Sequence, residues 1–128
     1  MSQTILYIED NPLNMRLVRK LLKSFGYSMI EAIDGASGLA KVEEIKPDLI
    51  LMDVNLPDAD GLELTQRIKK MEDFAHIPIV AITANAMHGD RERCLEAGCQ
   101  GYLPKPVSRT ELRNMVNHFL ANEKKVAV

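Results

Sequence analysis

Five short apolar segments, each followed by a segment with helical periodicity, constrain the fold of this chain more than any other feature of its sequence. They lie at residues 4–8, 28–32, 49–52, 77–82 and 101–103. Most of them lack the polar alternation of a strand that is exposed on one face, so we expect strands buried on both faces. Such strands are typical of a parallel sheet that helices cover on each side. The pattern therefore predicts a doubly wound α/β fold, and right-handed β–α–β crossovers leave few topologies for it.

Residues that commonly begin helices precede several of the helical segments. Asn11 followed by Pro12 is typical of an N-cap and the first residue of a helix. Asp90 is interpreted as the N-cap of the fourth helix. Ser108, with Glu111 three residues later, has the pattern of a capping box at the start of the last helix. These signals support the alternation of strands and helices.

Composition excludes several classes of protein. One domain is expected to span residues 1–128, with a core at about 4–120 and a short tail at 121–128. The 16 basic and 18 acidic residues give a formal charge of −2. The chain therefore lacks the excess of basic residues that would form a basic face for nucleic-acid binding. No apolar run approaches the roughly 20 residues of a membrane helix, and the N-terminus lacks the pattern of a signal peptide. We therefore expect a cytoplasmic protein that binds neither nucleic acid nor membrane.

Two short motifs are interpreted as structural rather than functional. Cys94 and Cys99 are five residues apart, which fits neither a CxxC motif nor half of a zinc site, so we expect two reduced thiols. Asp58-Ala59-Asp60 is similar to some metal-binding motifs, but it lies in the loop after the third strand. We interpret it as a solvated turn.

Polar side chains follow four of the five predicted strands, at the point where each strand ends. Glu9 and Asp10 follow the first strand, Asp53 the third, Thr83 the fourth and Lys105 the fifth. In open α/β sheets the ligand site lies beyond the carboxyl ends of the strands, so we expect these side chains to converge. Three neighbouring carboxylates repel one another and favour a divalent cation. Oxygen ligands without a histidine suit Mg²⁺ better than zinc or non-haem iron.

A carboxylate that faces such a cation can also act as a nucleophile and form an aspartyl phosphate. Phosphoryl transfer depends mainly on positioning and on neutralisation of charge. Mg²⁺, the ammonium group of Lys105 and the hydroxyl of Thr83 could supply both, each at a different oxygen of the phosphoryl group. The strand ends therefore point to phosphoryl-transfer chemistry.

The order of these motifs resembles the receiver domain of two-component response regulators. The motifs are ED-N-P, LILMD-V-N-L-P, AITANAM and YLPKP, and the resemblance covers residues 4–120. The segments at 48–61 and 75–108 look most like stand-alone regulators of the DivK kind, and they are also similar to receiver domains of hybrid histidine kinases. For the fold, the resemblance implies a flavodoxin-like (βα)5 sandwich whose parallel sheet has the strand order 2-1-3-4-5.

The resemblance also implies a role for each residue of the acidic site. Asp53 would be the phosphoacceptor, taking a phosphoryl group from the phosphohistidine of a histidine kinase or a histidine phosphotransfer protein. Mg²⁺ would be held by Glu9, Asp10, Asp53 and the backbone carbonyl of Asn55. Asn55 and Asn85 would tune the rate at which the phosphoryl group is hydrolysed. The protein would carry out only this self-phosphorylation and autodephosphorylation, and would not be an enzyme in the usual sense.

A second group of residues would convert phosphorylation into a change of surface. By resemblance, Thr83 would be the switch hydroxyl, Tyr102 the aromatic residue that turns inward with it, and Lys105 the phosphate-binding lysine. The peptide bond before Pro106 would be cis. Phosphorylation would then alter a surface on the fourth helix, fifth strand and fifth helix, roughly Asp90–Phe119, which binds a downstream protein. No output domain is expected.

Other functions stay open. The phosphoryl group could equally pass onward to a histidine phosphotransfer protein. A metal-dependent phosphatase or phosphotransferase for small metabolites would need a general acid, and no candidate follows Asp53 at short spacing. A flavodoxin-like cofactor binder would need a phosphate-binding loop after the first strand, where Glu9 and Asp10 would instead repel the phosphate.

Overall fold

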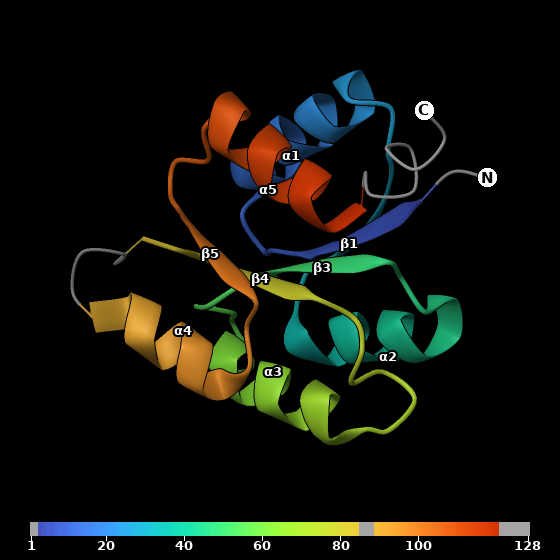
Figure 1. Ribbon diagram of the computed structural model, residues 1–128, viewed down its shortest axis with the longest axis vertical. Helices are drawn as coiled ribbons and strands as arrows, with labels where there is room; N and C mark the ends of the chain where they lie inside the picture. Colours follow the sequence, from blue (N-terminus) through green and yellow to red (C-terminus); the bar gives the residue numbers. More distant parts are fainter. Residues whose placement is uncertain (1–2, 85–88, 121–128) are drawn as a thin grey trace.

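Strands and helices alternate along the whole described part of the chain (Figure 1). The computed structural model describes residues 3–84 and 89–120. The strands are β1 (Thr4–Ile8), β2 (Ser28–Ala32), β3 (Leu49–Asp53), β4 (Ile79–Thr83) and β5 (Gly101–Pro104). The helices are α1 (Pro12–Ser24), α2 (Gly35–Ile45), α3 (Gly61–Lys70), α4 (Arg91–Ala97) and α5 (Arg109–Leu120).

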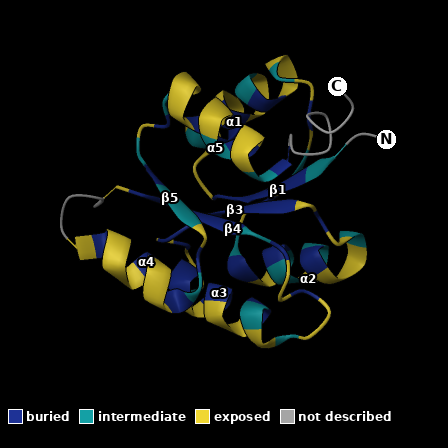
Figure 2. Ribbon diagram, viewed as in Figure 1, coloured by how far each residue is buried: buried dark blue, intermediate teal, exposed yellow. Residues whose placement is uncertain are grey.

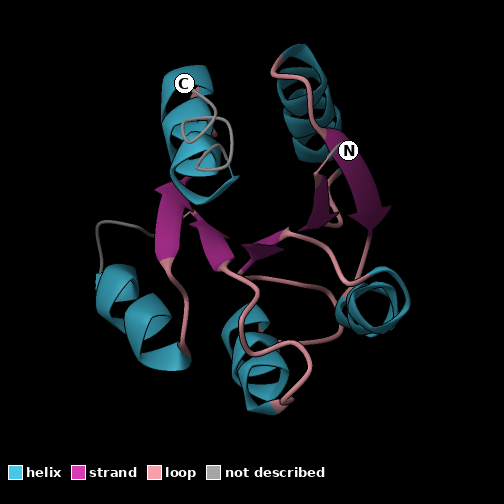
Figure 3. Ribbon diagram, turned by 45° about the vertical axis from the view of Figure 1, so that its right-hand side comes forward, coloured by secondary structure: helices cyan, strands magenta, loops and turns pink. Residues whose placement is uncertain are grey.

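The five strands form one parallel sheet in the order β2-β1-β3-β4-β5. This confirms the predicted doubly wound, flavodoxin-like α/β fold. Helices α1 and α5 cover one face of the sheet, and α2, α3 and α4 cover the other (Figure 1). The turned view in Figure 3 shows the strands between the two helix layers.

Each face of the sheet has its own apolar core, because successive side chains of a strand point to opposite faces. In β1, Ile5 and Tyr7 face α1 and α5, whereas Leu6 and Ile8 face the other helix layer. Every residue of β3 and β4 is buried, which accounts for the continuous apolar segments in the sequence. Figure 2 shows this buried centre and the exposed outer faces of the helices.

Helix starts follow the sequence signals, with one exception. The side chain of Asn11 caps α1 by accepting hydrogen bonds from two backbone N–H groups, those of Leu13 and Asn14. Asp90 occupies the N-cap position of α4, but within the described residues its side chain makes no capping hydrogen bond there. The predicted position of the cap is therefore confirmed, but the predicted capping hydrogen bond is not, because the carboxylate of Asp90 has other partners.

The loop after β3 is exposed at Asp58, as a solvated turn would be, but its aspartates also form hydrogen bonds to helix starts. The carboxylate of Asp58 accepts hydrogen bonds from the backbone N–H groups of Gly35 (2.7 Å) and Ala36 (3.1 Å), at the start of α2. Asp60 caps α3 through the N–H of Leu62. Both aspartates are thus structural, and they fix the loop between two helix starts.

None of the described helices is long and apolar enough to span a membrane. The predicted reduced state of the cysteines is consistent with the structure, in which Cys94 and Cys99 are free and buried.

Candidate functional site

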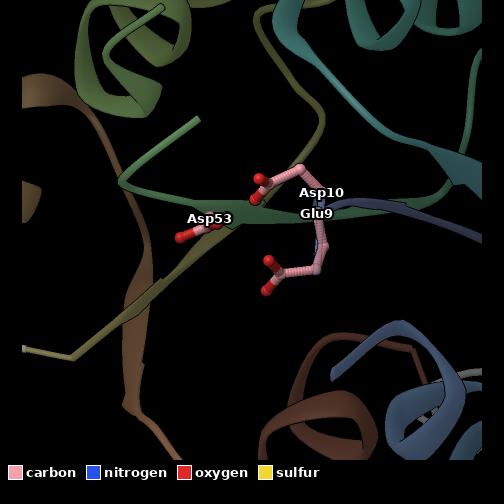
Figure 4. Close-up of side chains that lie close together, drawn as sticks. All are labelled: Glu9, Asp10 and Asp53. Atoms are coloured by element: carbon pink, nitrogen blue, oxygen red, sulfur yellow. The ribbon is translucent and has the colours of Figure 1, made fainter. Parts of the chain in front are cut away.

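An acidic cluster lies at the carboxyl edge of the sheet, where the adjacent strands β1 and β3 end. Glu9 and Asp10 directly follow β1, and Asp53 is the last residue of β3. One carboxylate oxygen from each of the three residues lies within 4.8 Å of the others. Figure 4 shows Glu9 and Asp10 projecting to opposite sides of the chain, with Asp53 beside them. The pairing of β1 with β3 therefore brings together side chains 43 positions apart.

Glu9 is almost completely buried and is held by three donors. Its Oε1 accepts a hydrogen bond from the hydroxyl of Tyr7 at 2.9 Å and lies 3.1 Å from Nζ of Lys105. Its Oε2 accepts from the backbone N–H of Asn11 at 3.1 Å. Burial opposes ionisation, but these hydrogen bonds outweigh it and lower the pKa of Glu9. Glu9 is therefore an anion with a fixed orientation.

Asp53 is also only 1% exposed, and its environment is less favourable to its charge. Its Oδ1 accepts a hydrogen bond from the backbone N–H of Asn55 at 3.1 Å and another from Nζ of Lys105 at 3.2 Å. Burial, with the neighbouring charge of Glu9 as a further cause, raises the pKa of Asp53 to about 6. Asp53 is thus the carboxylate that gains most from a nearby cation.

Lys105 connects the two buried carboxylates. Its ammonium group lies 3.1 Å from Glu9 Oε1 and 3.2 Å from Asp53 Oδ1, and its side chain is 20% exposed. Burial opposes the charged form, but both carboxylates favour it and raise the pKa of Lys105. The peptide bond from Lys105 to Pro106 is cis, the form that the family resemblance implies.

The loop after Asp53 is tightly constrained. The N–H of Gly61 donates to the carbonyl of Val54 at 2.8 Å, and Asn55 forms a β-bridge with Asp60. A Cβ atom at position 61 would clash with the carbonyl oxygen of Asp53, so only glycine fits this approach. These contacts hold the start of α3 against the end of β3, and they fix the backbone of Asn55 next to Asp53.

The donor set fits a magnesium ion. Glu9, Asp10 and Asp53 offer hard carboxylate oxygens, and the exposed side chain of Asp10 leaves one side of the cluster open to water. Mg²⁺ prefers oxygen ligands and keeps several of its waters, so a cluster with few protein ligands suits it. The carbonyl of Asn55 is the expected further ligand.

Thr83 and Tyr102 lie on the neighbouring strands β4 and β5. Ala81 pairs with Tyr102 and Thr83 with Pro104, so the side chains of Thr83 and Tyr102 belong to the same face of the sheet. The hydroxyl of Thr83 donates to Oδ2 of Asp90 at 2.5 Å. Tyr102 is partly buried and packs against the core on the side of α3 and α4. The second predicted tuning residue, Asn85, lies outside the described residues.

Sequence reasoning missed two side chains that support this site. Tyr7 was assigned only to a strand, although it lies two residues before Glu9 and so shares its face. Asp90 was interpreted as a helix cap, and its bond to Thr83, seven positions away, is a contact that periodicity does not indicate. The signal available for Tyr7 was its spacing of two residues from Glu9, because alternate residues of a strand share a face. The sequence held no comparable signal for Asp90.

This fold and acidic site define a receiver domain of the response regulators. The family model described as response regulator receiver domain matches residues 5–117, and the chain belongs to this family. Among curated relatives it is similar to the polar-differentiation response regulator DivK of Brucella ovis, with 41% identity over 122 residues, 95% of this chain and 99% of that protein.

Solved structures agree with this assignment. The receiver domain of a sensor histidine kinase from Pseudomonas aeruginosa, with a magnesium ion in its active-site cleft, matches with a TM-score of 0.87 and 40% identity over 95% of this chain and all of that one. The chemotaxis protein CheY4 of Vibrio cholerae matches with a TM-score of 0.87 and 25% identity over 94% and 100% of the two chains.

Proposed function

We propose that residues 4–120 act as a receiver domain that accepts a phosphoryl group on Asp53 in a Mg²⁺-dependent reaction. The observation that carries this proposal is the geometry around Asp53. Two further carboxylates lie within 4.8 Å of it, and Nζ of Lys105 lies 3.2 Å away. Such an arrangement places anionic metal ligands, a nucleophile and a cation for the phosphoryl oxygens at one point.

The proposed phosphodonor is the phosphohistidine of a histidine kinase or of a histidine phosphotransfer protein. A carboxylate oxygen of Asp53 attacks the phosphorus, an O–P bond forms, and the P–N bond to the donor's imidazole breaks. The imidazole nitrogen keeps the electron pair of that bond. With a pKa of about 6, Asp53 is mainly ionised at neutral pH, as a nucleophile must be.

The remaining residues of the site hold the charges of this reaction. Lys105 turns from the carboxylates towards a phosphoryl oxygen, where its positive charge is most useful. Glu9 and Asp10, with the backbone carbonyl of Asn55, would hold Mg²⁺, whose role when bound is to neutralise charge on the transferring group. Thr83 would donate to a further phosphoryl oxygen, and Tyr102 would turn inward with it. Asn55 and Asn85 would tune the hydrolysis that ends the signal.

The proposed output surface is the face of α4, β5 and α5. A groove runs between β5 and α5, and Tyr102, Pro104, Glu111, Met115 and His118 line it. Because Tyr102 belongs both to this groove and to the proposed switch, a change in its position would alter the groove. We propose that a downstream protein binds here. We propose a cytoplasmic location for this protein, where ATP is available to phosphorylate the histidine kinases that would act as donors.

Intact-mass spectrometry after incubation with acetyl phosphate tests the proposed reaction. We expect one phosphoryl adduct on the wild-type protein, none after removal of Mg²⁺ with EDTA, and none on the Asp53→Asn variant. The Asp73→Asn variant is the matched control, because it removes an exposed carboxylate remote in sequence from the site and should be phosphorylated normally. An adduct that persists in Asp53→Asn would contradict Asp53 as the nucleophile.

A further inference from the structure

The carboxylate of Asp90 is buried and is engaged on both oxygens. The residue is 4% exposed. Oδ2 accepts the hydrogen bond from the hydroxyl of Thr83 at 2.5 Å, and Oδ1 accepts from Nη1 of Arg93 at 2.9 Å. A buried carboxylate is costly unless it is hydrogen-bonded, and bonds to an ionised acceptor are short and strong. The Thr83–Asp90 contact therefore stabilises the present position of the Thr83 hydroxyl.

A threonine hydroxyl has one proton to donate. Thr83 donates it to Asp90 in this structure, and in the proposed phosphorylated state it would donate to a phosphoryl oxygen on Asp53. The two acceptors therefore compete for the same proton. Asp90 lies directly before α4, so the exchange of partners would also change what holds the start of that helix.

We propose that Asp90 is a positioning residue that opposes phosphorylation by holding the hydroxyl of Thr83 in the resting arrangement. The inference rests on the proposed function, because it needs a phosphoryl group at Asp53. Arg93 reduces the strength of this effect. Its guanidinium contacts the other oxygen of Asp90, so the carboxylate would keep one partner after Thr83 had left. The side chain of Arg93 is 56% exposed, so it can follow Asp90 without being buried itself.

Binding of beryllofluoride, a stable analogue of the phosphoryl group, tests this competition in the full chain. The titration is followed by NMR in the presence of Mg²⁺, and the measured quantity is the dissociation constant. For Asp90→Ala we expect binding about tenfold tighter than wild type, the size of one hydrogen bond to a charged group. Asp90→Asn keeps a neutral acceptor and should tighten binding less, so it also serves if the alanine variant fails to fold.

A double-mutant cycle separates competition for Thr83 from a general effect on the fold. In a Thr83→Val background the hydroxyl is gone, and Asp90→Ala should then leave the dissociation constant unchanged. Asp34→Ala, which removes the capping carboxylate of α2, is the matched control and should not tighten binding.

The outcomes distinguish this inference from the proposed function. If the wild-type protein does not bind beryllofluoride, the proposed function fails and the inference with it. If the wild-type protein binds but neither Asp90 variant binds more tightly, only the inference is overturned. Equal tightening in the Thr83→Val background would also overturn it, since Asp90 would then act through another group.

Discussion

At the scale of single residues, the hydroxyl of Tyr7 is one of the three donors that orient Glu9 in the acidic site. It is fully buried and donates to Oε1 of Glu9, the same oxygen that Lys105 contacts. Burial next to Glu9 raises the pKa of Tyr7, so the hydroxyl keeps its proton and remains a donor. Glu9 is therefore satisfied even when no cation is bound.

Tyr7→Phe should lower the free energy of unfolding in EDTA by about 1–2 kcal/mol, because Glu9 loses one of its donors while it stays buried. Added Mg²⁺ should reduce this difference, since the cation replaces part of the lost stabilisation. Urea denaturation with and without Mg²⁺ measures both effects. Tyr27→Phe is the matched control, because the Tyr27 hydroxyl bonds to Asn117 away from the site. Equal stability of Tyr7→Phe and wild type would contradict the assigned role.

At the scale of elements, hydrogen bonds to the start of α2 hold the loop between β3 and α3 in place. The carboxylate of Asp58 accepts from Gly35 and Ala36 at the first turn of α2, and Asp60 begins α3. The same loop, between β3 and α3, carries Asn55, whose carbonyl is the proposed metal ligand. The stiffness of the site thus comes from two helix starts as well as from the sheet.

Asp58→Ala should reduce the affinity for Mg²⁺ about threefold to tenfold and destabilise the fold by about 1 kcal/mol, the usual cost of a lost cap. Asp58→Asn keeps an oxygen acceptor and should lose less of both. Isothermal titration with Mg²⁺ and urea denaturation measure the two quantities. If a variant loses stability but binds Mg²⁺ as wild type does, the hydrogen bonds of Asp58 do not influence the metal site.

The packing of α4 against the sheet also buries two thiols, which should protect them from reagents. Cys94 lies in α4 and Cys99 just after it. Cys94 and Cys99 are 0% and 5% exposed, and burial raises the pKa of Cys99 to about 12. Only the thiolate reacts readily, so a thiol reagent should modify the native protein at least about 100-fold more slowly than the protein in denaturant. The rate of modification measures this. Fast reaction of the native protein would indicate that α4 opens readily from the sheet.

At the scale of the whole molecule, two apolar cores stabilise a fold in which the buried charge of Asp53 is unfavourable. Glu9 and Asp53 are both 1% exposed and carry negative charge at the sheet edge. The pKa of Asp53 is higher in the folded protein than in the unfolded chain, so its contribution to stability is present at low pH. That contribution is lost as the pH rises through about 6.

Asp53→Asn should therefore be more stable than wild type at pH 8 without Mg²⁺, by about 2 kcal/mol. The difference should shrink as the pH falls through about 6 towards 4, where wild-type Asp53 becomes protonated. Urea denaturation at several pH values in EDTA measures it. Addition of Mg²⁺ at pH 8 should stabilise wild type and not the variant. A difference that is independent of pH would contradict the raised pKa.

The residues were sufficient for the doubly wound α/β class because the signals that define it are local, whereas the strand order came from the family resemblance. The apolar segment at 49–52, the glycine and proline boundaries and the polar strand ends are each readable within a few residues. These signals were also sufficient to bring Glu9, Asp10, Asp53 and Lys105 to one edge, since a parallel sheet aligns its strand ends. The family resemblance supplied their individual roles.

Pairings between side chains on different loops could not be read in this way. Asp58 lies 22 and 23 positions from the N–H groups it accepts from, and any acceptor of similar length could have occupied that position. Asp90 had a satisfactory local interpretation as a helix cap, yet the bond to Thr83 prevails. Both contacts join separate elements, so the periodicity of a single element does not indicate them.

The adjacency of β1 and β3 has a practical consequence. Their pairing belongs to both apolar cores, so the acidic residues at their ends cannot separate unless the two halves of the interior open together. A form in which β1 and β3 had separated would therefore lose the site, and such molecules could not be labelled on Asp53. Substitutions far from the site would then weaken signalling in a cell simply by reducing the number of native copies.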